Sequence, residues 1–169
     1  MMSQITVRSN RKWFAALPAA LFALSIAFLA AGCLTMTPSL PPMDLSEAGW
    51  TVHQGQAVWH PARGAAVLVG ELLVATHSDG RAFAQFTKSP LPIVVAQITT
   101  NSWQIHFVPE NRSFSGRGNP PPRLIWLHLL RCLTGAEPLP AFTWRRQADN
   151  RWSLENRSSG ELLEGYFAP

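Results

Sequence analysis

The strongest constraint on this chain lies near its beginning, where an apolar run separates the first residues from those that can form a globular domain. The run extends over residues 13–31, contains Ser25 as its one polar residue, and follows the basic residues Arg8, Arg11 and Lys12. A short positive region, an apolar stretch and then small residues are typical of a secretory signal peptide. The folded part of the protein must therefore come from the residues after this run.

The run ends in Leu29-Ala30-Ala31-Gly32-Cys33, which resembles the lipobox of bacterial lipoproteins. The resemblance implies that residues 1–32 are a cleaved signal peptide and that Cys33 receives the thioether-linked lipid. The basic residues precede the run, so the remainder of the chain is expected to be exported. By analogy with lipoprotein sorting rules, an aspartate after the cysteine would favour the inner membrane, whereas this chain has Leu34. We therefore expect a protein anchored in the outer membrane and facing the periplasm.

The alternative is an uncleaved transmembrane anchor, because an apolar run of this length also crosses a hydrocarbon core of about 30 Å. Pro18 within the run, the Gly32-Cys33 ending and the Pro-rich residues 35–42 favour cleavage. Both interpretations place the remaining chain outside the cytoplasm.

The charge of the remaining chain argues against a nucleic-acid partner. The formal net charge is +4, but three of the 14 Lys and Arg residues precede Cys33 while all ten Asp and Glu residues follow it. A nucleic-acid-binding protein needs a basic face with a reading element, and none is recognisable here. Arg112, Arg117, Arg123 and Arg131 are close in sequence and could face anionic lipid headgroups, although scattered surface arginines are the more ordinary interpretation.

After Cys33 the sequence predicts a tether and one domain. Residues 33–48 comprise the lipidated cysteine and a Pro-rich tether, and residues 49–169 suit a single fold with its own core. Once Cys33 carries lipid, the other cysteine, Cys132, has no intramolecular partner. Cys132 lies in an apolar stretch and is interpreted as a packed core residue.

Most of the domain is expected to be antiparallel β-structure. Runs rich in β-branched residues, separated by turn sequences such as Ser78-Asp79-Gly80, predict strands. The expected strands cover residues 65–76, 81–88, 93–98, 103–108, 142–146, 152–154 and 161–168. Residues 67–69, 72–74 and 93–95 are apolar on both faces, which implies that both faces of the sheet are covered or that one lines an apolar cavity. A two-layer core with a packed helix and a curved sheet around a cavity both remain open.

One helix is expected, at residues 123–134, between Asn119-Pro120-Pro121-Pro122 and Gly135. Its residues are too apolar for a surface helix, so it should be largely buried. Residues 113–118 are interpreted as a loop, because their glycines match neither a nucleophile elbow nor a phosphate-binding pattern. Residues 49–64 give no clear assignment.

Several short sequence stretches, in the same order along the chain, resemble the LolA/LolB family of periplasmic lipoprotein carriers and receptors. They are residues 80–86, Ser89-Pro90-Leu91, residues 124–130 and Trp152. The resemblance implies an unclosed antiparallel β-barrel with a helix packed in or over it, around an apolar cavity that holds acyl chains. It also implies that Leu91 matches the exposed leucine on a protruding loop of the receptor, and that a periplasmic carrier is a possible partner.

The ligand-binding candidates are the large apolar side chains that could line such a cavity, because acyl chains need only a dry apolar surface. They are Leu91, Trp103, Phe107, Trp126, Leu130, Trp144 and Trp152. No pattern typical of catalysis, of a metal site or of a cofactor site is found, so we expect a protein that is not an enzyme. The alternative function is a structural or interaction lipoprotein whose core is filled by its own side chains and whose surface docks an envelope partner.

Overall fold

The computed structural model describes residues 39–62 and 65–169. The expected signal peptide, the alternative transmembrane anchor and the lipidation site Cys33 lie outside the described residues. Residues 39–169 belong to one compact unit, and its core cluster is formed by side chains between Ala57 and Phe167. This unit therefore contains a complete hydrophobic core of its own.

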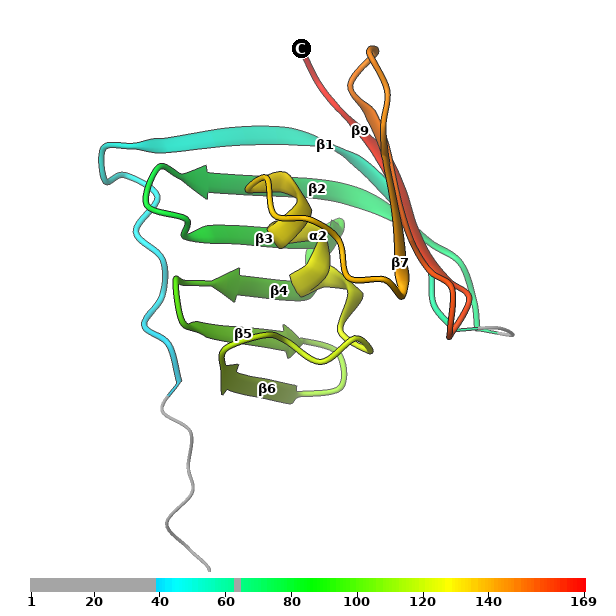
Figure 1. The fold of residues 1–169 in the computed structure, drawn as a ribbon, viewed down its shortest axis with the longest axis horizontal. Coiled ribbons are helices and arrows are strands. Elements are labelled where there is room, and N and C mark those ends of the chain that lie inside the picture. Colours follow the sequence, from blue (N-terminus) through cyan, green and yellow to red (C-terminus); the bar gives the residue numbers. More distant parts are fainter. Residues whose placement is uncertain (1–38, 63–64) are drawn as a thin grey trace, which may run out of the picture. The chain divides into compact units, whose positions relative to one another are not determined.

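The unit is mainly β: nine antiparallel strands form one curved, unclosed sheet, and a single short helix packs on it (Figure 1). The strands are β1 (Trp50–His60), β2 (Leu68–His77), β3 (Ala82–Lys88), β4 (Leu91–Ile98), β5 (Ser102–Phe107), β6 (Arg112–Arg117), β7 (Phe142–Arg146), β8 (Arg151–Asn156) and β9 (Glu161–Phe167). Their order in the sheet is β6-β5-β4-β3-β2-β1-β9-β8-β7, so β6 and β7 are the two edges. The fold class expected from the sequence is confirmed.

The concave face of the sheet forms the core. In β5, Trp103 and Ile105 are buried while Gln104 and His106 point to the outer face, as the period of two in a strand requires. The curvature is strong enough that Trp59 of β1 stacks on Phe107 of β5, with ring centroids 6.3 Å apart, although three strands separate β1 from β5 in the sheet. Residues far apart in the sequence thus meet on this face.

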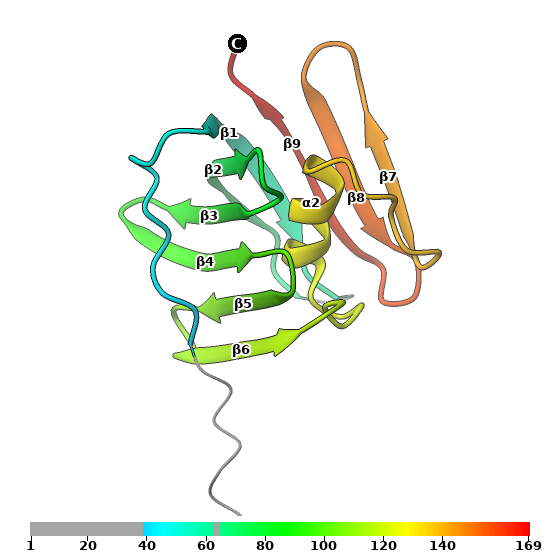
Figure 2. The same cartoon turned by 60° about the vertical axis from the view of Figure 1, so that its left-hand side comes forward.

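Helix α2 (Ile125–Leu133) lies against the concave face, where it contacts β2 to β5 on one side and β8 on the other (Figure 2). Trp126 packs on Phe86, with ring centroids 5.1 Å apart, and Leu130 is completely buried. The expected helix at residues 123–134 is therefore present and buried. No helix in the described part of the chain is long and apolar enough to cross a membrane.

Two strands were not predicted from the sequence. Residues 113–118, interpreted as a loop, are mostly β6, and this interpretation was wrong. The segment lacks a hydrophobic pattern because β6 is an edge strand with an exposed outer side, and its backbone pairs with β5. Residues 50–60, left unassigned, form β1, which pairs with both β2 and β9 and joins the two halves of the sheet.

Candidate functional site

The seven predicted ligand-binding residues do not form one site. Trp126 and Leu130 lie on the buried face of α2 with almost no exposed surface, and Trp144 stacks on Trp152 in the β7–β8 hairpin at 6.2 Å. Trp103 borders a cavity of about 260 Å³ between the β4–β5 turn and residues 118–120. Leu91 is 65% exposed, but it is the first residue of β4 and pairs with Lys88 of β3, so it does not lie on the protruding loop that the resemblance implied. The structure therefore separates these residues into a packed core, a hairpin stack and single positions.

Phe107, the remaining predicted residue, lines an aromatic cleft on the concave face beside the beginning of α2. The cleft has a volume of about 290 Å³, near the lower limit of typical small-molecule sites. Its lining residues are Trp59, Phe107, Glu110, Arg112, Phe114, Arg123 and Leu124. We call this set of residues the aromatic cleft.

The floor of the aromatic cleft is a continuous series of ring contacts. Phe107 stacks on Trp59 and meets Phe114 edge to face, in both cases with ring centroids 6.3 Å apart. Trp59 in turn meets the buried Trp126 edge to face at 5.6 Å, so the floor is continuous with the core under α2. Such a surface accepts an apolar chain by burial alone, without directional bonds.

Trp59 is held in this floor by a buried carboxyl group. Its indole Nε1 donates a hydrogen bond of 2.9 Å to Oε1 of Glu161, which is only 9% exposed. Burial raises the pKa of the Glu161 carboxyl, and the hydrogen bond from Trp59 opposes the rise. Glu161 therefore positions Trp59 in the floor of the aromatic cleft.

Trp59, Phe114 and Leu124 were missed by the sequence analysis. Gly55, Ala57 and Trp59 are alternate residues on the concave face of β1. This period of two could have indicated that the Trp59 side chain points to the concave face. Phe114 had no comparable signal, since it lies between two serines in the edge strand β6.

On the other side of the sheet, the segment Ser39–Ala48 is bound to the outer face by polar contacts. The Leu40 amide donates a hydrogen bond to Gln104 Oε1, and Gln97 Nε2 donates one of 3.4 Å to the Pro41 carbonyl. This segment borders a further cavity of about 410 Å³ over β3 to β5. We call Ser39–Ala48 the strap.

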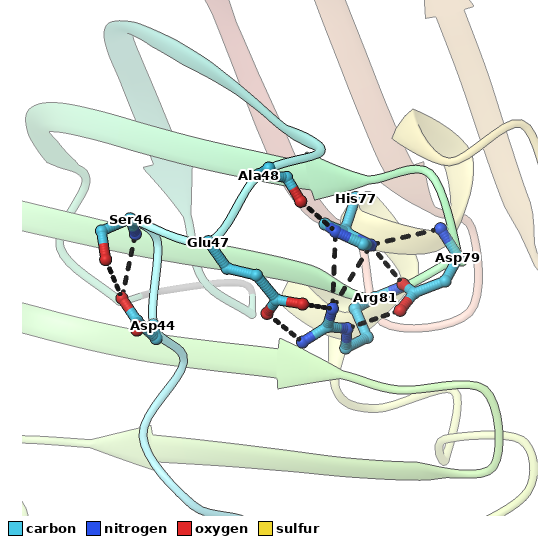
Figure 3. Close-up of polar contacts among 7 residues, drawn as sticks. All are labelled: Asp44, Ser46, Glu47, Ala48, His77, Asp79 and Arg81. Atoms are coloured by element: carbon cyan, nitrogen blue, oxygen red, sulfur yellow. Dashed lines mark hydrogen bonds and ion pairs between the residues drawn. The ribbon is translucent and has the colours of Figure 1, made fainter.

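An ion cluster fixes the end of the strap (Figure 3). The Arg81 guanidinium donates to both carboxylate oxygens of Glu47, at 2.9 and 3.0 Å, and its Nε donates to Asp79 at 2.7 Å. Hydrogen bonding from Arg81 lowers the pKa of Glu47, and hydrogen bonds led by the Arg81 amide lower the pKa of Asp79 to about 2. The Arg81, Glu47 and Asp79 side chains are therefore ionised at neutral pH.

His77 contacts both the strap and the same ion cluster. Its Nε2 contacts the Ala48 carbonyl at 3.0 Å, and its Nδ1 lies 2.8 Å from Asp79 Oδ1. In the described part of the chain no hydroxyl or thiol is hydrogen-bonded to His77, and no three His, Cys, Asp or Glu side chains there are grouped as metal ligands. The contacts of His77 fix the strap and the β2–β3 turn.

Two further titratable side chains, Cys132 and His128, are buried in the core. Burial raises the pKa of the Cys132 thiol to about 11, which keeps it protonated. Burial also lowers the pKa of His128, whose Nε2 lies 3.2 Å from the Pro121 carbonyl and whose ring packs on Phe142. Both side chains stabilise the attachment of α2.

Comparison of the chain with models of known protein families gave no match, and comparison with curated protein sequences gave none.

Proposed function

We propose that the chain is a bacterial envelope lipoprotein, anchored by acylated Cys33, whose β-rich domain binds an acyl chain of a lipid or lipoprotein in the aromatic cleft. In this proposal it acts in the manner of a LolB-like receptor at the outer membrane, facing the periplasm. The observation that carries the proposal is the row of rings formed by Trp59, Phe107 and Phe114 on the concave face. The lipobox and the exposed Leu91 support it from the sequence.

The anchor gives this function its location. Each buried methylene of a lipid chain contributes about 0.8 kcal/mol to membrane binding, so more than one chain on Cys33 holds the protein on a membrane. A domain at that surface meets amphiphiles at high local concentration.

The test is binding of a fluorescent fatty acid to delipidated residues 34–169, a fragment that contains the complete core. Native mass spectrometry of the purified fragment reports any lipid that copurifies. We expect saturable binding that Phe114→Glu abolishes, because a charge replaces the ring in the floor of the aromatic cleft. Tyr166→Glu is the matched control, because Tyr166 is 44% exposed on the outer face. No binding by the unmodified fragment contradicts the proposal.

A second function, docking of an envelope partner by a domain with a filled core, is favoured by the position of α2. Trp126 and Leu130 occupy the concave face with 1% and no exposure, respectively. Under this function the fragment is purified without lipid and binds no fatty acid, and Leu91→Glu weakens capture of a protein partner. The acyl-chain proposal instead expects Leu91→Glu to leave fatty-acid binding intact and to slow transfer of cargo from a carrier.

A further inference from the structure

The mouth of the aromatic cleft carries positive charge from two side chains. Arg112 and Arg123 both lie over the Phe114 ring, with their Cζ atoms 5.3 and 5.7 Å from its centroid. Arg112 comes from β6 and Arg123 from the segment before α2, so the fold brings together two charges that are eleven residues apart in sequence. Arg117 and Arg131, which the sequence grouped with them, are not among the lining residues of this cleft.

Neither charge is firmly neutralised by the protein. Arg112 pairs with Glu110 at 3.1 Å, but both side chains are more than half exposed, and such pairs contribute at most about 1 kcal/mol. Within residues 39–62 and 65–169, no carboxylate lies within ion-pair distance of Arg123. An anion at the mouth can therefore bind Arg123 without breaking an existing pair and can replace Glu110 at Arg112.

The beginning of α2 adds a third positive contribution. Leu124 is both the N-cap residue of α2 and a lining residue of the aromatic cleft. No side chain caps this end, and the first turn contains no acidic residue. The amide dipoles of an uncapped helix N-terminus favour a negative charge nearby, which acts in the same direction as the two guanidinium groups.

We propose that the aromatic cleft selects single-chain amphiphiles with an anionic headgroup, whose tail lies on Trp59, Phe107 and Phe114 and whose phosphate or carboxylate binds Arg112 and Arg123. The inference rests on the proposed function and specifies its ligand class. The volume of about 290 Å³ suits part of one chain and not several chains at once. The planar guanidinium groups match the oxygen geometry of phosphate and carboxylate groups.

The test compares three amphiphiles with the same tail and different headgroups: dodecyl phosphate, dodecyl maltoside and dodecyltrimethylammonium. Each is titrated below its micelle concentration into delipidated residues 34–169 by isothermal calorimetry. We expect dodecyl phosphate to bind at least about tenfold more tightly than dodecyl maltoside, as one or two charge-assisted hydrogen bonds provide. Dodecyltrimethylammonium should bind most weakly. Equal affinities for the three headgroups would overturn the inference while leaving the acyl-chain proposal intact.

Variants separate this site from the general charge of the protein. Arg112→Gln with Arg123→Gln should remove the roughly tenfold preference for dodecyl phosphate over dodecyl maltoside, when both affinities are measured in the same variant. Arg117→Gln with Arg146→Gln removes the same charge elsewhere and should change neither affinity. An equal loss of affinity for dodecyl phosphate in both double variants would mean that it responds to the net positive charge of the protein and not to this site, and would overturn the inference.

Inorganic phosphate is the final arm, because it has the same anionic chemistry without a tail. We expect millimolar phosphate not to displace dodecyl phosphate, since burial of the tail supplies most of the affinity. Displacement would identify a free-anion site and contradict selection of an amphiphile. If no amphiphile binds at all, the proposed function fails together with the inference.

Discussion

At the scale of single residues, Glu161 is an acidic group held largely out of water. It is a carboxyl group buried on the concave face, and its one hydrogen-bond donor from a side chain is Trp59. A neutral acceptor at this position would keep the hydrogen bond and avoid the cost of a buried charge.

Glu161→Gln tests this description through the pH dependence of stability. The pKa of Glu161 is raised in the folded state, so the folded protein binds more protons than the unfolded one and loses stability as pH rises through the carboxyl range from about 4.5 upward. We expect the variant to be as stable as the unmodified domain near pH 4 and more stable at pH 7.5, in urea unfolding followed at both pH values. A variant that is less stable at pH 7.5 would contradict the raised pKa.

At the scale of elements, α2 is the part that fills the concave face. Leu130 is completely buried there, and Leu→Ala in such a position costs about 2–5 kcal/mol because a cavity remains. We expect this loss for Leu130→Ala in urea unfolding, whereas Leu91→Ala, at an exposed position, should change the stability by less than about 0.5 kcal/mol. Similar small losses in both variants would mean that α2 does not fill the core.

The strap is the second element with a testable attachment. Arg81→Gln removes both hydrogen bonds to Glu47, so the amide resonances of Leu40 and Ala48 should shift, and the Leu40 amide should lose protection from exchange while the core amides stay protected. Arg151→Gln is the control, because it removes an exposed pair with Asp149 elsewhere. Unchanged strap resonances in Arg81→Gln would show that the ion cluster does not hold the strap.

Acid should release the strap in the unmodified protein as well. The folded pKa values of Glu47 and Asp79 are lowered, that of Asp79 to about 2, so the stability that these carboxylates contribute is complete above about pH 4.5 and is lost as pH falls toward 2. An NMR titration of the Ala48 amide from pH 6 to pH 2 measures this. A strap that stays bound at pH 2 would contradict the role of the cluster.

The elements differ in how much the sequence revealed of them. Strand β2 was predictable because its β-branched run ends at a turn sequence, β3 to β5 and β7 to β9 because apolar or aromatic residues recur between turn sequences, and α2 because an apolar run lies between Pro122 and Gly135. Edge strand β6 was not, since pairing with β5 rather than its own hydrophobic pattern defines it. The expectation that residues apolar on both faces are covered or line a cavity was wrong at Val67 and Val69, which are 50% and 58% exposed. Elsewhere α2 covers the concave face, and the strap borders a cavity beside Phe83 and Val95 on the outer face.

The candidate site was less predictable than the fold. Phe107 could be named because it continues the inward alternation of Trp103 and Ile105. Its partners Trp59 and Phe114 come from β1 and β6, and only the curvature of the sheet brings them to it. A pattern within one strand carries no information about such curvature, which depends on the twist summed over the intervening strands.

At the scale of the whole chain, the proposed lipid anchor precedes a domain with a small apolar cleft. Cys33→Ser removes the thiol that the lipid requires, so the unmodified protein should carry the mass of the attached lipid and lack residues 1–32, whereas this variant should carry no lipid. Intact-mass measurement of both proteins, extracted from the membrane fraction of an expressing bacterium, reports this. An unmodified protein that retains residues 1–32 and carries no lipid would instead favour an uncleaved transmembrane anchor.

The most direct test of acyl-chain binding is to determine where on the protein a bound fatty acid lies. A fatty acid with a diazirine in its tail is bound to delipidated residues 34–169, activated by light, and the labelled peptides are identified by mass spectrometry. If the acyl chain lies in the aromatic cleft, labels should fall on the peptides that contain Trp59, Phe107, Phe114 and Leu124, and unlabelled fatty acid should reduce this labelling. Labels that resist competition and spread over the outer face, or that gather at Trp103 and Trp152, would contradict it.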